Sequence, residues 1–342
     1  MQVEPTARTR AATVNPYTTP VIPKVRFERF VDYPSQRSGW AYAQRALAPL
    51  THDGANAILL DTMIERNFAR ELPLALRESR IPYRQPWLGF VHVPPGIPSW
   101  QDDSKSLLRI AALDAWQNSL PHCRGLITLS RDLRDWVADQ VPGVPVLALH
   151  HPTELAERTF DFDTYLQHGQ PIVQVGWWLR RLASIHFLPL PPVRKQLLIP
   201  TIAEVRPRFD AALDAECRQS GAPPLAHWAA SIVPRLVNDD YDALLARSIV
   251  FLDLYASVAN NAVIECMVRH TPVLINRQPS PVEYLGEEYP FFFENLGEAA
   301  AKAADPDLVL ATHRYLAARD TSFLTGEHFC RTLAESALYR SL

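Results

Sequence analysis

Glycine is scarce in this chain, and its spacing excludes two common phosphate-binding motifs. Only 12 of the 342 residues are glycine, and no two of them lie closer than seven positions apart, the separation of Gly89 and Gly96. A GxGxxG dinucleotide fingerprint and a GxxxxGK phosphate loop both need closer glycines. Any bound phosphate must therefore be held by helix N-termini and side chains.

Cysteine pairs, long apolar runs and an excess of positive charge are also missing. The 4 cysteines form no CxxC motif, which excludes a zinc or redox site of that kind. We expect no transmembrane segment and a soluble, cytoplasmic protein, because no run of eighteen apolar residues and no N-terminal signal core occur. A net charge of -3 lacks the basic footprint of a nucleic-acid binder, so we expect no nucleic-acid partner.

What is present is a regular alternation of short apolar runs and helical patterns. The chain is 47% hydrophobic and long enough for two cores. The apolar runs predict buried strands within 25–33, 56–64, 87–93, 125–130 and 144–151, and then within 171–178, 195–202, 248–255, 271–277 and 289–295. Strands alternating with helices predict an α/β protein with mostly parallel sheets covered by helices on both faces.

A polar, strand-poor segment over 151–170 separates the two series of strands. We therefore expect a flexible tail over 1–24, a Rossmann-like domain over 25–155, a second over 156–320, and a C-terminal helix over 321–342 that could pack back on the first domain. Ligands of such sheets bind at the carboxyl ends of the strands. The expected site is the cleft between the two domains.

The stretch "SVANNAVIECMVRHTPVLINRQPSPVEYLG" (257–286) carries the clearest candidate site. Ser257, Asn260 and Asn261 are good capping residues at the start of a helix. The free N–H groups and the dipole at such a start suit a diphosphate. Glu265 falls one turn later on the same face, where its carboxylate can accept hydrogen bonds from the vicinal hydroxyls of a ribose. A capped surface helix with a solvated glutamate fits the same pattern.

Adjacent histidines at 150 and 151 do not predict a metal site. Neighbours on a strand point to opposite faces, and no third ligand stands at metal spacing. We expect no metal.

The order of these motifs resembles that of GT-B glycosyltransferases, specifically the retaining, nucleotide-sugar-dependent group 1 (family 4-like) enzymes. The letters "IEC", "HTPVLIN" and "PVEYLG" stand where that family has its C-terminal motif, and the resemblance covers about 25–342. It implies two Rossmann-like domains facing a central cleft. It also implies transfer of a sugar from a nucleotide-diphosphate-sugar donor to an acceptor hydroxyl, with retention, without a metal and without a further cofactor.

In the second domain, the resemblance assigns donor-binding roles. Glu265 and Glu283 match two of the family's glutamates, whereas Ser257 stands where a further acidic residue is the rule. A glycine that ends the first strand, with basic residues after it, clamps the donor diphosphate in that family. The counterparts here are Gly176, Arg180, Arg181 and Lys195. Any one arginine could instead pair structurally with a carboxylate.

In the first domain, the resemblance points to a strand-end histidine and a loop. His92, before "VPPGIP", would hydrogen-bond a sugar hydroxyl or orient the acceptor. Ser38, Gly39 and Trp40 would lie on the acceptor side. A buried histidine and a capped helix with a core tryptophan are the simpler alternatives for these positions.

Two other functions fit the same motifs. One is a nucleotide-sugar epimerase of the same fold, and the other is a non-catalytic protein that binds a nucleotide sugar. The acceptor of a transferase remains open among a glycan, a lipid, a small metabolite and a peptide.

Overall fold

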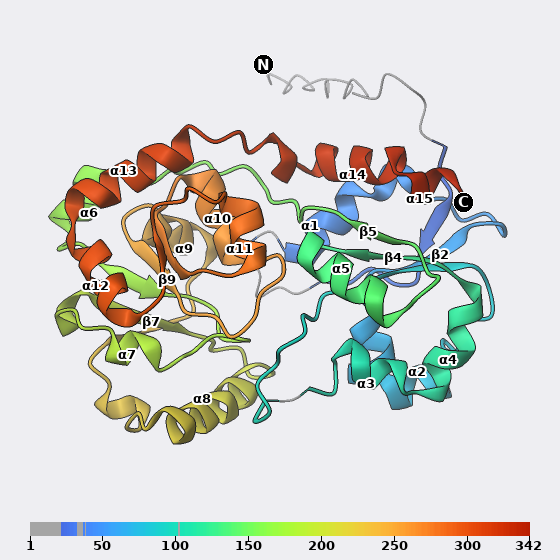
Figure 1. Cartoon of the computed structure of the whole chain (residues 1–342), viewed down its shortest axis with the longest axis horizontal. Coiled ribbons are helices and arrows are strands. Elements are labelled where there is room, and N and C mark those ends of the chain that lie inside the picture. Colours follow the sequence, from blue (N-terminus) through green and yellow to red (C-terminus); the bar gives the residue numbers. More distant parts are fainter. Residues whose placement is uncertain (1–21, 33–36, 38, 102) are drawn as a thin grey trace, which may run out of the picture.

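The computed structural model describes residues 22–32, 37, 39–101 and 103–342, and it contains two parallel sheets side by side (Figure 1). The N-terminal sheet has the consecutive order β1-β2-β3-β4-β5. Its strands are β1 (Val25–Phe27), β2 (Ile58–Asp61), β3 (Trp87–Phe90), β4 (Cys123–Thr128) and β5 (Val146–Ala148). In the described residues this sheet is parallel throughout, as expected from the sequence, and it never reverses its order.

The C-terminal sheet has the order β11-β10-β9-β6-β7-β8, with every pair parallel. Its strands are β6 (Ile172–Gln174), β7 (Lys195–Ile199), β8 (Ser231–Pro234), β9 (Ile249–Leu252), β10 (Val273–Asn276) and β11 (Phe292–Phe293). The order reverses between β6 and β9, so the two strands leave a crevice at their carboxyl ends. This parallel sheet agrees with the Rossmann-like second domain expected from the sequence.

The predicted strands are confirmed, since every strand except β8 overlaps an expected apolar run. β8 forms an edge of its sheet, and its residues are mostly exposed, so it lacks the apolar signal of a buried strand.

Helices connect the strands in both halves (Figure 1). The first half has α1 (Gly39–Ala46), α2 (Leu72–Arg77), α3 (Leu107–Ala111), α4 (Asp114–Ser119) and α5 (Arg131–Gln140). The second half has α6 (Phe162–Gln167), α7 (Ser184–Phe187), α8 (Arg206–Ser220), α9 (Asn238–Leu245), α10 (Asn261–Arg269), α11 (Pro279–Leu285), α12 (Leu296–Ala304) and α13 (Pro306–Ala317). The last two are α14 (Gly326–Glu335) and α15 (Ala337–Arg340).

The chain ends on the half in which it began. After α13 it crosses back, so that α14 lies beside α1 and α15 follows beside α14 (Figure 1). Phe329 and Leu333 of α14 and Leu338 of α15 belong to the N-terminal hydrophobic core. The Tyr339 hydroxyl donates to the Ile22 carbonyl at 2.9 Å, which ties part of the predicted tail to α15; residues 1–21 lie outside the described part of the chain.

Helix α11 and the loop before α10 join the two halves. The Tyr284 hydroxyl donates to the Leu129 carbonyl at 2.8 Å and accepts from His151 N at 2.9 Å. Val258 packs into the N-terminal core although it belongs to the C-terminal half by sequence. The loop that carries Ser257 therefore lies between the halves. Among the described residues no helix is long and apolar enough to cross a membrane.

Candidate functional site

The crevice between β6 and β9 is formed by two loops, and Arg180 ties one to the other. Its guanidinium donates from Nε to the Val175 carbonyl at 2.9 Å, from Nη1 to the Trp178 carbonyl at 2.8 Å, and from Nη2 to Asn260 Oδ1 at 3.2 Å. Burial lowers the pKa of Arg180 to about 10, so the side chain is still a cation at neutral pH. A half-buried guanidinium thus lies at the start of α10.

Gly176 makes this position of Arg180 possible. It has a φ of +74°, a conformation that L side chains rarely adopt. A Cβ at this residue would lie 2.6 Å from Arg180 Cζ. The glycine that ends the β6 segment is therefore required both for the turn and for the close approach of the guanidinium.

Asn260 caps α10, as the sequence predicts. Its Oδ1 accepts from Ala262 N at 3.1 Å, so the same oxygen receives both the helix N–H and the Arg180 guanidinium. Asn261 is the first residue of the helix. The positive end of the helix dipole and a cationic side chain meet at this point, which favours a negatively charged ligand.

Glu265 lies in the second turn of α10 and is buried, which excludes a solvated surface glutamate. The Tyr241 hydroxyl donates to its Oε2 at 3.0 Å. Burial raises the pKa of Glu265 to about 7, although the nearby Arg269 and the Tyr241 hydroxyl act in the opposite direction. The carboxyl group thus changes its charge near neutral pH.

A narrow pocket brings Glu265 face to face with the N-terminal half. It is lined by Gly39, His151, Pro152, Thr153, Asn261, Ile264 and Glu265. The sequence-predicted residues Gly39, Asn261 and Glu265 therefore share one site. The pocket has no room for a nucleotide in this conformation, and its lining comes from both halves of the molecule.

His151 is a site residue that sequence reasoning weighed only as a metal ligand. Its Nδ1 lies 2.7 Å from the Pro152 carbonyl oxygen, and burial lowers its pKa to about 4. The ring is therefore neutral at pH 7. The described residues contain no group of three or more His, Cys, Asp or Glu that could hold a metal ion.

Trp40 belongs to the core, not to an open acceptor surface. It is 2% exposed and packs edge-on against Phe90 and His92, with ring centroids 5.0 and 4.6 Å away. His151 is the third ring around it. Trp40 thus supports the two histidines at the strand ends. Ser38 lies outside the described residues.

Arg181 faces the other side of the crevice. Its Nη1 pairs with Asp253 Oδ1 at 2.8 Å, and its guanidinium lies over the Tyr255 ring at 4.5 Å. Trp100 of the proline-rich loop in the N-terminal half meets the same ring edge-on at 5.5 Å. Beside Arg181 is a polar hollow of about 330 Å³, lined by Arg181, Asp253, Asn276, Arg277, Phe293, Glu294, Asn295 and Leu296.

Lys195 lies apart from this group. It opens β7 and pairs in register with Ile172, the first residue of β6, so it stands at the amino edge of the sheet. Its Nζ donates to the carbonyls of His186 at 2.8 Å and Leu188 at 2.9 Å. Since the crevice is at the opposite edge, Lys195 supports local structure and cannot reach a diphosphate there.

Glu283 is occupied in joining the two halves. Its Oε1 lies 3.0 Å from His150 Nε2, and its Oε2 accepts from Arg131 N at 2.7 Å. Burial alone would raise the pKa of this carboxyl, but these hydrogen bonds outweigh it and the pKa is lowered. The structure thus gives Glu283 an interdomain role. Ser257 Oγ donates to the Val258 carbonyl at 3.0 Å, within the same loop.

Arg37 is an interdomain residue that the sequence did not single out. Its Nη1 pairs with Glu154 at 2.7 Å, and its Nη2 pairs with Asp242 of α9 at 3.2 Å. Asp242 also pairs with Arg269 at 2.7 Å. Arg269 Nη1 in turn donates to the Glu265 backbone carbonyl at 3.1 Å. This chain of contacts ties the loop before α1 to the helix that carries Glu265.

Comparisons with known proteins agree with this arrangement. No protein-family model and no curated protein matches the chain. Among solved structures, sucrose-phosphate synthase from Thermosynechococcus elongatus matches with 13% identity and a TM-score of 0.59, over 83% of this chain and 73% of that one.

Two further structures were solved with nucleotide bound. A mutant of S. aureus TarM in complex with Fondaparinux, alpha-GlcNAc-glycerol and UDP matches at 13% identity and a TM-score of 0.53, over 86% of this chain and 59% of that one. Anabaena HepE in complex with UDP and glucose matches at 14% identity and a TM-score of 0.53, over 81% and 76%. At these identities the likeness concerns the fold alone, and on that basis the chain has the GT-B fold of these glycosyltransferases.

Proposed function

We propose that the protein is a glycosyltransferase that moves a sugar from a nucleotide-diphosphate-sugar donor to an acceptor hydroxyl. The observation that carries the proposal is the convergence of Arg180 and the capped start of α10, with Glu265 one turn further along. In a sheet with this order, that position is the crevice where ligands bind. The UDP complexes of TarM and HepE support a nucleotide sugar as the donor.

The diphosphate would lie at the first turn of α10. Arg180 uses one N–H each from Nε, Nη1 and Nη2, so of the five N–H groups of a guanidinium about two remain for a ligand. Breaking the bond between sugar and diphosphate builds negative charge on the leaving group. A cation and helix N–H groups that are already in place stabilise that charge.

The other residues take roles around the diphosphate. Glu265 accepts hydrogen bonds from the ribose hydroxyls, and Arg181 lines the polar hollow where a sugar or a phosphate has room. His92 faces the sugar side. The proposal includes retention of anomeric configuration, with the leaving phosphate taking the acceptor's proton, and catalysis without a metal ion, as the sequence resemblance implies. It also includes a cytoplasmic location, as expected from the sequence composition.

A second candidate is a non-catalytic protein that binds a nucleotide sugar. It is favoured by Ser257 in place of an acid, by the engagement of Glu283 between the halves, and by the distant position of Lys195. These three positions leave fewer groups for the donor sugar than the motif of the family provides.

One experiment separates these functions. The protein is incubated with a panel of nucleotide sugars and mixed acceptors, and the products are followed by mass spectrometry. Sugar transfer or slow donor hydrolysis supports the transferase, and a free nucleotide with an epimerised sugar indicates the epimerase. Thermal stabilisation by a donor without any turnover indicates the binding protein, with about 2.7 kcal/mol expected at a hundredfold excess over Kd.

A further inference from the structure

The segment that follows β3 is held by one carboxylate. Glu65 is 4% exposed, and its Oε1 accepts from two consecutive backbone N–H groups, from His92 at 2.5 Å and from Val93 at 2.9 Å. A carboxylate that receives two backbone N–H bonds fixes the direction in which the chain leaves the strand. It thereby fixes where the His92 side chain begins.

The second oxygen of Glu65 faces the ring of the same histidine. Oε2 lies 3.5 Å from His92 Nδ1, just beyond an ordinary hydrogen bond. Within the described part of the chain, neither that oxygen nor either ring nitrogen of His92 has a hydrogen-bond partner, although all three atoms are buried. Buried polar atoms without partners are uncommon and cost free energy, so such a group calls for a functional explanation.

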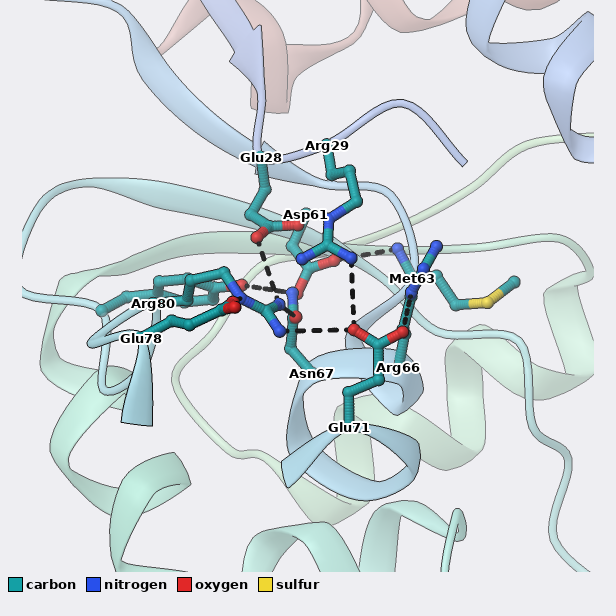
Figure 2. A network of polar contacts seen from close by, with 10 residues as sticks. Glu28, Arg29, Asp61, Met63, Arg66, Asn67, Glu71, Glu78 and Arg80 are labelled. Atoms are coloured by element: carbon teal, nitrogen blue, oxygen red, sulfur yellow. Dashed lines mark hydrogen bonds and ion pairs between the residues drawn. The ribbon is translucent and has the colours of Figure 1, made fainter. Parts of the chain in front are cut away.

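The backbone on both sides of Glu65 is anchored independently of His92. Asp61, at the end of β2, accepts from Met63 N at 3.0 Å and from Asn67 Nδ2 at 3.1 Å. Figure 2 shows the surrounding network, in which Arg29, Arg66 and Arg80 converge on Glu71. Glu65 lies between two anchored positions, so its carboxylate approaches His92 from a rigid support.

We propose that Glu65 is the positioning residue for His92: one oxygen holds the backbone, and the other accepts a hydrogen bond from Nδ1–H, so that Nε2 is the nitrogen offered to a hydroxyl of the sugar or the acceptor. Trp40 holds the ring from the side. The inference rests on the proposed function for the identity of the hydroxyl. The placement of the proton on the ring does not depend on it.

The direct test is the tautomer of His92 in the Glu65→Gln variant. The glutamine oxygen can still accept from the two backbone N–H groups, so the variant should fold, but its NH2 then faces Nδ1 and donates to it. In histidine-labelled protein at pH 8, where free imidazole is neutral, nitrogen NMR should show the proton on Nδ1 in the wild type and on Nε2 in the variant. His92→Gln assigns the signal, and Glu78→Gln is the control, since Glu78 pairs with Arg80 away from His92.

Activity provides the second measurement. Glu65→Gln should lower the kcat of sugar transfer about tenfold, by analogy with the loss of other orienting partners of a histidine, and should leave the Kd of the nucleotide unchanged. An unchanged tautomer, or a changed tautomer with unchanged kcat, overturns the inference. If the wild type transfers no sugar, the proposed function fails, and the NMR result alone decides whether Glu65 sets the proton on His92.

Discussion

Arg180 Nη2 lies 3.2 Å from Asn260 Oδ1, and this contact joins the loop after β6 to the first turn of α10. The two residues are eighty positions apart in the sequence and follow the two strands, β6 and β9, between which the sheet reverses its order. A cation and a helix N-terminus are thereby held together before any ligand arrives, so little reorganisation is needed when an anion binds.

The Arg180→Gln variant should lose affinity for the diphosphate part of a nucleotide and no other part. We expect the affinity for a nucleoside diphosphate to fall roughly tenfold to a hundredfold, the usual worth of a charge-assisted hydrogen bond. The affinity for the corresponding nucleoside should stay the same. Calorimetric titration of both ligands measures this, with the exposed Arg84→Gln as the control. Equal losses for both ligands would mean that the variant has disturbed the fold.

Glu265 should make the stability of the protein depend on pH. Its folded pKa of about 7 is above the ordinary value of 4.5, so the folded state holds the proton more tightly than the unfolded state. The free energy of unfolding should therefore fall by up to about 3 kcal/mol, from this group alone, as pH rises from about 4.5 to 7. Above pH 7 the contribution of Glu265 should stay constant. Urea unfolding should show that the Glu265→Gln variant is more stable than the wild type at pH 8, whereas the two proteins should be about equally stable at pH 5. The same difference at both pH values contradicts the assignment.

Breaking the contact between Arg37 and Asp242 should ease nucleotide entry. The pocket beside Glu265 is closed, and Arg37 ties its two sides together. Arg37→Met should lower the free energy of unfolding by about 1–3 kcal/mol, because it removes partners from Asp242 and Glu154. It should also tighten nucleotide binding severalfold, because less energy is then spent on opening. Stopped-flow binding and urea unfolding measure the two effects, with Arg84→Met as the control; weaker binding would show that Arg37 contacts the ligand instead.

Lys195 should contribute to the stability of the fold and not to the binding of the nucleotide-sugar donor. Its Nζ donates to two backbone carbonyls at the amino edge of the sheet, and its removal takes a donor from each, although the Leu188 carbonyl still accepts from Leu190 N at 2.8 Å. Lys195→Met should cost about 1–3 kcal/mol of stability, with the Kd for a nucleoside diphosphate unchanged. If the variant loses affinity for the nucleoside diphosphate without losing stability, Lys195 binds the diphosphate and the structural role assigned to it is wrong.

The strands and the cap of α10 could be predicted from the sequence because their signals are local. A buried strand needs an apolar run, and an N-cap needs a side chain such as that of Asn260 directly before the helix. β8 was not predicted from the sequence because an exposed edge strand has no apolar run. The likeness to the GT-B fold followed from the order of the motifs, which the topology of the C-terminal sheet preserves.

The remaining parts of the site depend on how the two halves pack, which no local pattern contains. Arg37 and His151 become site residues only because the N-terminal half meets α10. Lys195 was misleading because sequence spacing after Gly176 does not tell whether a residue ends one strand or begins the next. Glu283 matches a motif of the family, yet its carboxylate makes hydrogen bonds to residues of the N-terminal half.

The central claim is that a nucleoside diphosphate binds at the start of α10 with its ribose against Glu265. Isothermal titration of a panel of nucleoside diphosphates into the wild type and into Glu265→Ala tests it most directly. We predict that at least one nucleotide binds the wild type and that its Kd rises at least about tenfold in the variant, as expected for the loss of hydrogen bonds to a charged group. Equal affinity for both proteins, or no binding of any nucleotide to the wild type, would contradict the claim.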